Sequence, residues 1–534
     1  MSTPVVTPTA QLQAQPQSTQ AQSTQPQPTR AELTEPQPAQ AQAQAQATQP
    51  QPAQAQVTEP QPRTGQAQPG LGGPAAGIDP GAFPDAIRPL APVVGAELTT
   101  PLAAGGELRY ANLDYAASAP ALVEVADHLN EVLPYYASVH RGAGYASQVS
   151  TSVYENARGT VREFLGARPD DEVVFTRNTT DALNLLAGCI PGPGDVLYLD
   201  IEHHANLLPW QARPHRSVVA ARTLAETLER VRAWLKAGEI SLLAVTGASN
   251  ITGEILPIAE LARLAHEHGA RIAVDAAQLA PHRRIDVASA DIDYLAFSGH
   301  KLYAPFGAGV LVGRADWLDR GKPHLAGGGA VREVRLDSVV WADGPARHEA
   351  GSPNVLGAAT LAKAAQVISS LDEGAWHRHE QQLRDALVAG LGEVEGVTVH
   401  RLFEDSDLGA GPASRGSIGV VNFSIAGHDA GLTAAYLSAE HGVGLRDGRF
   451  CAHPALRRLG LPSGSLRASF GLGSRLEDVE RLVFGVRDLV EHGVRLDYTV
   501  DSGRWVPTHD ARPFPAWAPN TPGTAGAAPC TAED

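Results

Sequence analysis

The stretch Phe297-Ser298-Gly299-His300-Lys301-Leu302-Tyr303 places one lysine directly after a histidine and three residues after a serine. Upstream, the run Arg271-Ile272-Ala273-Val274-Asp275 has the apolar character of a buried strand and ends in an acid. Gln278 follows about one helical turn later. An acid at a strand end, followed by a lysine among small polar residues, indicates a ligand site.

Pyridoxal phosphate (PLP) requires this set of side chains. Asp275 would keep the pyridine nitrogen protonated, so that the ring can act as an electron sink, and Lys301 would form the Schiff base. Ser298 and His300 would hold the phosphate. A surface lysine after a loop glycine is the alternative for Lys301 alone, but it leaves the matched acid, serine and histidine without an explanation.

Composition excludes several classes of protein. The 534 residues include 58 acidic and 42 basic ones, and the net charge of -16 argues against a nucleic-acid-binding surface. The three cysteines, Cys189, Cys451 and Cys530, form neither a disulfide framework nor a metal-ligand spacing, which favours a reducing compartment. No secretory signal and no run long enough to span a membrane is visible, so a cytoplasmic protein is expected.

Both ends of the chain differ from its body. Residues 1–75 are dominated by Gln, Pro, Ala and Thr, with a loose repeat seen at 24–28 and 58–62, and they predict a disordered tail. A spacer is the simplest role for this tail, and partner binding through extended Pro segments is the alternative. Residues 501–534 are rich in Pro and poor in aliphatic residues, which predicts a second loose tail.

Residues 80–365 alternate strand-like and helix-like patterns. Strands are expected at 171–176, 195–200, 240–246, 271–275, 294–297 and 308–312, and helices at 180–187, 221–237 and 258–267. This alternation predicts an α/β fold with a large, mostly parallel sheet that is covered by helices on both faces. Residues 366–500 are expected to form a smaller α+β domain that packs over the ligand site, with helices at 359–371 and 374–391 before short strands at 396–399 and 419–423.

Polar residues follow the predicted strands in the larger domain. Thr179 and Thr180 come after the first strand, His203 after the second, Asn250 after the third, and Asp275 ends the fourth. Ligands of open α/β sheets bind at the carboxyl ends of the strands, so topology and chemistry predict the same site.

The chain resembles the class V aminotransferase family of fold-type I PLP enzymes, and within it the group II cysteine desulfurases and selenocysteine lyases. The likeness covers about residues 108–490. It is carried by stretches in the family's order: 112–120 (NLDYAASAP), 140–142 (HRG), 178–184 (NTTDALN), 202–210 (EHHANLLPW), 249–253 (SNITG), 274–278 (VDAAQ), 297–303 (FSGHKLY), 349–354 (EAGSPN) and 466–469 (LRAS).

The resemblance implies roles for the remaining polar residues. Gln278 and Asn250 would hydrogen-bond the phenolic oxygen of the cofactor, and His203 would stack on its ring and shuttle protons. Thr179 and Thr180 would join Ser298 and His300 around the phosphate, where a helix N-terminus favours an anion.

Two further residues receive roles from the resemblance. Ser352 would reach the phosphate of a second subunit, which implies a homodimer with shared active sites. Arg467 would clamp the substrate carboxylate, for which a planar bidentate donor is suited, and a surface ion pair is its alternative. Arg446, Arg449 and Arg457 receive no role.

Cys451 decides which reaction the resemblance implies. It lies where group II desulfurases carry the thiolate that takes sulfur or selenium from an L-amino acid, giving alanine and an enzyme persulfide that passes to a sulfur acceptor. Arg449 and Phe450 replace the histidine-rich residues typical of that loop, and a buried structural cysteine is the alternative. A class V aminotransferase, C–S lyase or epimerase would use Lys301 without this cysteine, and a scaffold protein with a vestigial site is a third hypothesis.

Overall fold

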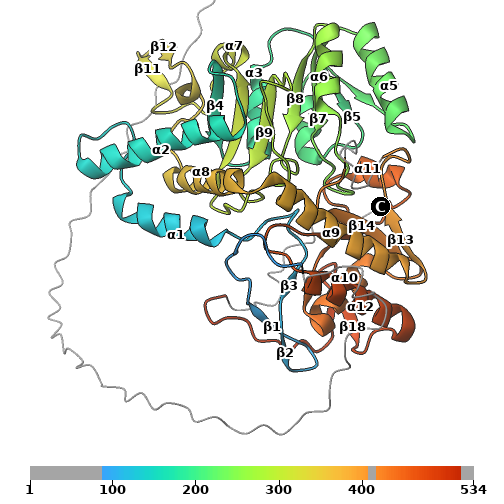
Figure 1. Cartoon of the computed structure of the whole chain (residues 1–534). Helices are drawn as coiled ribbons and strands as arrows, with labels where there is room; N and C mark the ends of the chain where they lie inside the picture. Colours follow the sequence, from blue (N-terminus) through green and yellow to red (C-terminus); the bar gives the residue numbers. More distant parts are fainter. Residues whose placement is uncertain (1–86, 407–415, 519–534) are drawn as a thin grey trace, which may run out of the picture. The chain divides into compact units, whose positions relative to one another are not determined.

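The computed structural model describes residues 87–406 and 416–518, all within a unit that runs from Gly72 to Asp534. Its larger part is built on a seven-stranded sheet (Figure 1). In spatial order the strands are β4 (Asp171–Thr176), β10 (Gly309–Arg314), β9 (Tyr294–Ser298), β8 (Arg271–Asp275), β7 (Ile240–Thr246), β5 (Asp195–Leu199) and β6 (His215–Val218).

The direction of the strands confirms the predicted fold class. β10 runs antiparallel to both β4 and β9, and the other neighbouring strands pair in parallel. The six strands expected from the sequence are present in this sheet within two residues of the predicted bounds. The short strand β6 was not expected, because three of its four residues are exposed and carry no apolar pattern.

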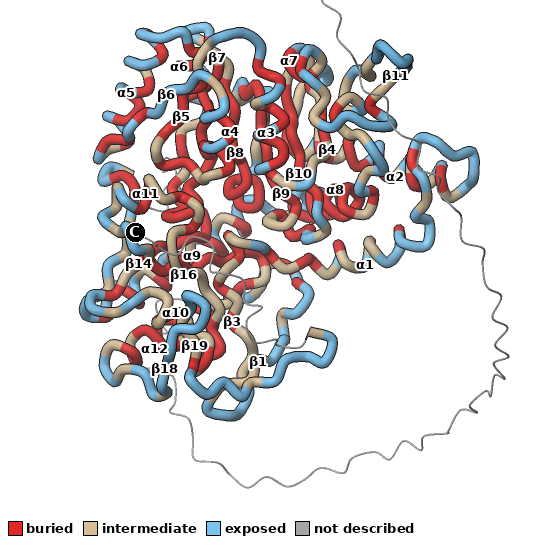
Figure 2. Tube along the Cα trace, turned by 180° about the vertical axis from the view of Figure 1, so that it is seen from behind, coloured by how far each residue is buried: buried red, intermediate tan, exposed pale blue. Residues whose placement is uncertain are grey.

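Helices cover both faces of this sheet. Successive residues of a strand point to opposite faces, and in β7 Leu242 and Ala244 belong to one apolar cluster whereas Leu243 and Val245 belong to the other. The first cluster is closed by α3 (Thr179–Cys189), α4 (Leu208–Gln211) and α7 (Ala315–Arg320). The second is closed by α2 (Tyr145–Phe164), α5 (Leu224–Ala237), α6 (Ile258–Glu267) and α8 (Val355–Ser370). Figure 2 shows the strands between these helices as the most continuously buried part of the chain.

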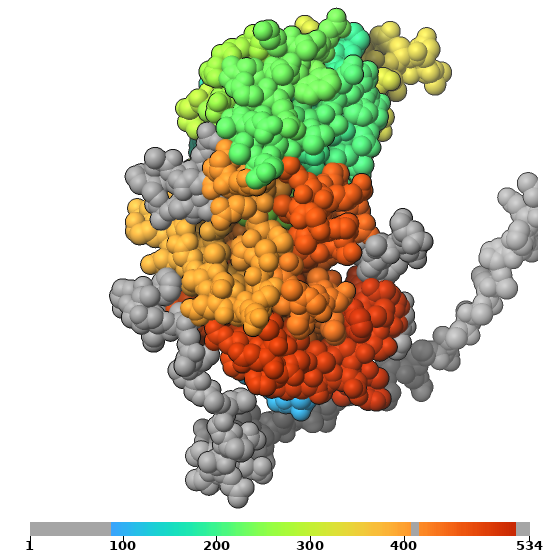
Figure 3. All heavy atoms as spheres, turned by 90° about the vertical axis from the view of Figure 1, so that its right-hand side faces the viewer, coloured from blue at the N-terminus to red at the C-terminus, as the bar shows by residue number. Residues whose placement is uncertain are grey.

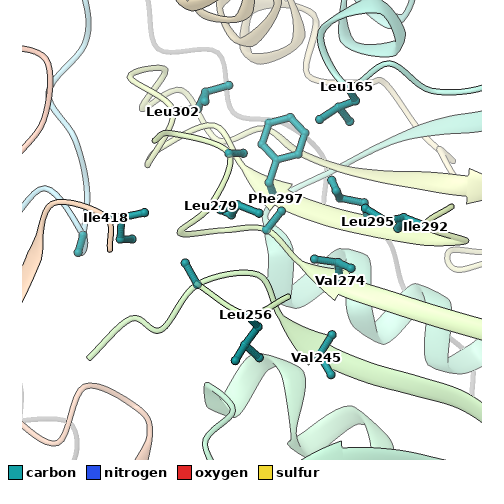
Figure 4. Close-up of a cluster of buried hydrophobic side chains, with 14 of the residues drawn as sticks. Leu165, Val245, Leu256, Val274, Leu279, Ile292, Leu295, Phe297, Leu302 and Ile418 are labelled. Atoms are coloured by element: carbon teal, nitrogen blue, oxygen red, sulfur yellow. The ribbon is translucent and has the colours of Figure 1, made fainter. Parts of the chain in front are cut away.

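The segment that contains Lys301 is fixed by the second cluster. Phe297 and Leu302, which flank the lysine, are fully buried in it (Figure 4). Gly299 lies so close to the following turn that an added Cβ would be 2.9 Å from the carbonyl oxygen of Ala308. The apolar flanks and the glycine therefore hold the lysine in a tight turn directly after β9.

A smaller antiparallel sheet has its own core. Its order is β13 (Val397–His400), β14 (Val420–Ile425), β17 (Ser465–Ser469) and β16 (Arg446–Gly448), and its helices are α9 (Glu373–Gly392), α10 (Ala430–His441) and α12 (Leu476–His492). In Figure 3 this orange-to-red part adjoins the green part that carries the large sheet. The predicted domain boundary near residue 365 falls inside α8 and remains a prediction.

Shorter elements complete the described residues. They are β1 (Thr99–Pro101), β2 (Glu107–Arg109), β3 (Ala111–Asn112), α1 (Val123–Val132), β11 (Val331–Val334), β12 (Val339–Trp341), β15 (Val443–Gly444) and α11 (His453–Arg458), with three short 3-10 turns at 133–135, 204–206 and 345–347. β15 pairs in parallel with β3 as a separate two-stranded sheet, which joins the beginning of the body to the segment that follows α10.

The start of the predicted C-terminal tail has regular structure. β18 (Tyr498–Asp501) and β19 (Arg504–Pro507) pair as an antiparallel hairpin, where the sequence had suggested a loose segment from residue 501. Its residues pack on α10, and this tertiary contact replaces the aliphatic core that the segment lacks. Residues 519–534 and the predicted tail 1–75 lie outside the described residues.

One buried ion pair joins three segments around α2. The carboxylate of Glu349 accepts two hydrogen bonds from Arg158, at 2.8 and 2.9 Å, one from Tyr154 Oη at 2.8 Å, and one from the backbone N–H of Phe175 at 2.7 Å. The Glu349 side chain is only 7% exposed. This acid of the 349–354 stretch therefore orders the loop before α8, which contains Ser352.

We expect Glu349→Ala to destabilise the protein by about 3–5 kcal/mol, because it leaves the Arg158 cation buried without its main partner. The matched control is Glu393→Ala, which removes an ion pair with Arg487 in which the Glu393 side chain is 53% exposed, and it should cost less than about 1 kcal/mol. Thermal unfolding of both variants followed by circular dichroism measures the difference. Equal melting temperatures would contradict this role of Glu349.

Candidate active site

A cavity of about 250 Å³ lies at the carboxyl ends of β5, β7, β8 and β9. The position agrees with the rule for open α/β sheets. Eleven of the predicted site residues line it: Thr179, Thr180, His203, Asn250, Asp275, Gln278, Ser298, His300, Lys301, Cys451 and Arg467. Ser352 does not, and it is exposed in the loop before α8.

Lys301 and Asp275 are two oppositely charged groups that line this cavity, which we call the inner cavity. Burial lowers the pKa of Lys301 to about 8, and the nearby Asp275 carboxylate opposes that shift. Burial raises the pKa of Asp275. A hydrogen bond from the backbone N–H of Ala277 at 2.9 Å and the positive charge of Lys301 both oppose this rise. A buried carboxylate of this kind is suited to pair with a ring nitrogen that carries a proton.

An anion cradle forms where α3 begins. Asn178 caps the helix by accepting a hydrogen bond from the backbone N–H of Asp181 at 3.0 Å. Thr179 donates its backbone N–H to Ser298 Oγ at 2.8 Å, and the two side-chain oxygens lie 2.7 Å apart. Hydroxyl groups from β9 and α3 thus meet at a helix N-terminus, the environment that a phosphate group prefers.

Two histidines border the cavity in their neutral form. Burial, reinforced by the positive charge of Lys301, lowers the pKa of His203 to about 3 and that of His300 to about 4. His203 Nδ1 accepts a hydrogen bond from the backbone N–H of Ala205 at 3.0 Å, which fixes the ring and places the remaining proton on Nε2. A neutral, fixed ring is suited to stack on a planar cofactor.

Gln278 and Asn250 each use one amide hydrogen within the protein. Gln278 Nε2 donates to the carbonyl oxygen of Ala116 at 2.8 Å, and Asn250 Nδ2 donates to that of Phe450 at 2.9 Å. Each NH₂ group has a second hydrogen, so both side chains retain a donor for a cofactor oxygen.

Arg467 enters the cavity from β17 of the small sheet. Its Nη1 donates to the carbonyl oxygen of Asn250 and its Nη2 to Asp114 Oδ1, both at 2.9 Å. The Arg467 side chain is 4% exposed, and its Nε is buried without a hydrogen-bond partner in the described part of the chain. The guanidinium is therefore aligned by Asp114 and has further N–H donors that a bound carboxylate could use.

Cys451 reaches the same cavity on a loop between β16 and α11. Phe450 and Cys451 both have left-handed backbone angles, with φ of 49° and 52°. Their carbonyl oxygens accept hydrogen bonds from Asn250 Nδ2 at 2.9 Å and from the backbone N–H of His204 at 2.8 Å. The larger part of the chain thus holds the cysteine loop in place.

Three residues of the site received no role from the sequence. Arg446 and Phe450 line the cavity, and Asp114 orients Arg467. Arg446 lies opposite Arg467 in the register of β16 and β17, and the Phe450 ring lies 5.2 Å from the Arg467 guanidinium. The presence of Asp114 in the stretch 112–120 was the one available signal, because short-range patterns do not reveal contacts across 353 residues.

Comparisons with known proteins confirm the family resemblance. A family model described as aminotransferase class-V matches residues 111–482. A cysteine desulfurase of Dickeya dadantii is 38% identical over 389 residues, which cover 70% of this chain and 91% of that protein. A probable cysteine desulfurase of Staphylococcus epidermidis is 34% identical and covers 72% of this chain and 92% of its own.

Solved structures of cysteine desulfurases are also similar to this chain. The apo structure of a cysteine desulfurase from Thermococcus onnurineus has a TM-score of 0.65 at 35% identity and covers 72% of this chain and 95% of its own. A cysteine desulfurase from Escherichia coli, solved in an S-sulfonic acid form, has a TM-score of 0.63 at 32% identity, with the same two coverages.

The donors and charges of the inner cavity fit PLP, with an acid for a protonated ring nitrogen, a hydroxyl cradle at a helix N-terminus for the phosphate, and a partly buried lysine. Within residues 87–406 and 416–518, no group of three or more His, Cys, Asp or Glu side chains could hold a metal ion. None of the helices in those ranges is long and apolar enough to cross a membrane. The chain belongs to the class V aminotransferase family, and its cofactor is PLP.

Proposed function

We propose that this chain is a cysteine desulfurase-like enzyme that removes sulfur, or selenium, from an L-amino acid and leaves alanine and a persulfide on Cys451. The observation that carries the proposal is that Cys451 lines the same cavity as Lys301, Asp275 and Arg467. A cysteine that served only to fill a core would be buried among apolar side chains, as Cys189 is.

Cofactor binding is assigned to the large-sheet side of the cavity. Lys301 would attach PLP, Asp275 would pair with its ring nitrogen, and His203 would stack on its face. Asn250 and Gln278 would donate to its phenolic oxygen, and the phosphate would lie against Thr179, Thr180, Ser298 and His300. When bound, PLP supplies an electron sink for negative charge at the substrate Cα.

The protein's own groups then position the substrate and move its protons. Arg467 would bind the α-carboxylate through its aligned guanidinium. Because burial lowers the pKa of Lys301 to about 8, its amine is neutral far more often at neutral pH than that of an ordinary lysine, and it can accept a proton from Cα. The same amine can return a proton as alanine forms.

Cys451 would attack the substrate sulfur. A new bond forms between Cys451 Sγ and that sulfur, while the bond between the sulfur and the substrate Cβ breaks and its electron pair returns to the carbon skeleton. The positive charges of Lys301 and Arg467 interact with Cys451, and nearby cations favour the reactive thiolate.

A homodimer with shared sites is also proposed. Ser352 is exposed and lies outside the cavity of its own chain, as expected for a residue that serves a second copy. Tyr135, Tyr136 and Tyr145 are 44–75% exposed, and exposed aromatic residues are enriched in protein interfaces. A sulfur acceptor as partner and a cytoplasmic location, consistent with the scattered thiols, belong to the same proposal.

Cys451→Ala should abolish the release of alanine from L-cysteine, and of sulfide when dithiothreitol is added to reduce the persulfide, while the protein still binds PLP and keeps the cofactor's visible absorbance. Cys189→Ala is the matched control, because Cys189 is buried against Gly321 and away from the cavity, and it should retain activity. Mass spectrometry of the wild-type protein after one turnover should find one added sulfur on the Cys451 peptide. Unchanged turnover in Cys451→Ala would instead favour a class V aminotransferase, C–S lyase or epimerase.

In the PLP-free protein, Lys301 should titrate near pH 8. Reductive methylation by formaldehyde and cyanoborohydride modifies only the neutral amine, so its rate at Lys301 should rise as the pH increases through 8 and then level off. Asp275→Asn should move the midpoint to lower pH, because the Asp275 carboxylate stabilises the ammonium form. Peptide mass spectrometry gives the rates, with the exposed Lys236 as reference, and a Lys301 profile identical to that of Lys236 would contradict the assignment.

If Ser352 contacts a phosphate in a second copy, Ser352→Asp should weaken PLP binding by about tenfold or more, since it places like charges together. Asp337→Asn, at an exposed position in the turn between β11 and β12, serves as a control that also changes one charge. Analytical ultracentrifugation should give about twice the chain mass of 56.0 kDa for the wild type. A monomer with unchanged PLP affinity in Ser352→Asp would disprove the shared site.

A further inference from the structure

Cys451 also borders a second cavity, which Lys301 does not line. This outer cavity has a volume of about 670 Å³, compared with about 250 Å³ for the inner one. The two cavities have three lining residues in common, Arg446, Phe450 and Cys451. The cysteine is therefore part of a partition between two cavities, and only the inner one contains the groups assigned to PLP.

The hairpin of β18 and β19 builds one wall of the outer cavity with Gly503, Arg504 and Trp505. It follows residue 482, where the match to the family model ends. Residues around it fasten it to the small-sheet part: Arg495 to Asp488 at 2.7 Å, and Tyr498 Oη to Glu440 at 2.9 Å. This wall therefore lies outside the region that the family model matches.

Trp505 fits closely against the beginning of α10. An added Cβ at Gly431 would lie 3.1 Å from Cδ1 of the Trp505 ring, so the helix has a glycine where the indole packs. Trp505 is only partly exposed, whereas Arg504 next to it is exposed to the cavity. The hairpin thus has an anchor residue and, next to it, an exposed cation that lines the cavity.

The charged residues of the outer cavity favour an anion. Arg446, Arg449 and Arg504 line it, compared with two acids, Asp429 and Asp447. Asp429 caps α10, where its Oδ1 accepts a hydrogen bond from the backbone N–H of Leu432 at 2.9 Å, and Asp447 interacts with the charges of Arg446 and Arg504. Three arginines against two acids leave an excess of one positive charge. An excess of cations is notable in a chain with a net charge of -16.

We propose that the outer cavity binds a low-molecular-weight thiol that carries a negative charge, and that this thiol takes the sulfur from Cys451. The volume lies within the range of about 300–1,000 Å³ that is typical of small-molecule sites. The inference rests on the proposed function, since it names the acceptor of the persulfide formed there.

The transfer is balanced without an added oxidant or reductant. The acceptor's thiolate attacks the outer sulfur of the Cys451 persulfide and forms a new S–S bond. The bond between that sulfur and Cys451 Sγ breaks, and Cys451 leaves as a thiolate, ready for the next substrate. Arg504 and Arg446 would hold the acceptor's anionic group while its sulfur faces Cys451.

Three thiols with the same two-carbon chain test the proposal: 2-mercaptoethanesulfonate (anionic), 2-mercaptoethanol (neutral) and cysteamine (cationic). The PLP-loaded full-length enzyme is first treated with L-cysteine, freed of excess substrate, and then mixed with each thiol. Loss of sulfur from the Cys451 peptide is followed by mass spectrometry, and rates are expressed per thiolate. The anionic thiol should react about tenfold faster than the cationic one, from the attraction of one or two nearby charges.

Arg504→Glu should remove or reverse this order, because Arg504 lines only the outer cavity. Lys236→Glu makes the same change of charge at an exposed position on α5 and should preserve it. Equal rates for the three thiols in the wild type, or an order unaffected by Arg504→Glu, would overturn the proposal. Discharge only by a cysteine on another protein would overturn it as well.

A second readout separates this proposal from the proposed function. Alkylation of Cys451 in the sulfur-free enzyme by iodoacetate (anionic) and by iodoacetamide (neutral) needs no desulfurase activity. The ratio of the iodoacetate rate to the iodoacetamide rate should fall about fivefold or more in Arg504→Glu and stay unchanged in Lys236→Glu. If the ratio falls in Arg504→Glu but L-cysteine never places sulfur on Cys451, the proposed function is wrong and the anion preference of the outer cavity stands. If L-cysteine places sulfur on Cys451 but the ratio does not change in Arg504→Glu, only the proposed outer site is wrong.

Discussion

The active site depends on two opposite charges, a buried carboxylate and a partly buried lysine, at the carboxyl ends of neighbouring parallel strands. Asp275 ends β8, and Lys301 follows β9 after a tight turn. Each group has a shifted pKa because of burial, and each limits the shift of the other. A buried charge without a partner costs several kcal/mol, so the pair is stable only while the sheet keeps the two strand ends adjacent. The apolar residues around Phe297 and Leu302 supply that rigidity.

The small sheet completes the site through a few polar contacts with the large-sheet part. Asn250 is central to them: its side chain donates to the carbonyl oxygen of Phe450, and its own carbonyl oxygen accepts from Arg467. The backbone N–H of His204 holds the carbonyl oxygen of Cys451. The residues assigned to the cofactor therefore also fix the position of the residues assigned to the substrate, and a change at Asn250 would affect both.

The sequence predicted the large sheet and most of the inner cavity because their signals are local. Strands such as 240–246 are continuous apolar runs, and the polar residues that follow them converge by topology alone. The missed features depend on contacts between distant segments. β6 is an exposed edge strand, Asp114 meets Arg467 across 353 residues, and the β18–β19 hairpin is ordered by its packing on α10. None of these has a periodic pattern of its own.

The loop of Cys451 shows how the two cavities come to share one residue. Two successive residues that are not glycine, Phe450 and Cys451, adopt left-handed angles, each of which costs about 1–3 kcal/mol. The hydrogen bonds to their carbonyl oxygens, from Asn250 and His204, offset this strain and determine how the backbone turns. A relaxed loop would not need these contacts and would leave the cysteine free to turn toward either side. The strained loop instead fixes it in the partition, where one thiol can accept sulfur from the inner cavity and present it to the outer one.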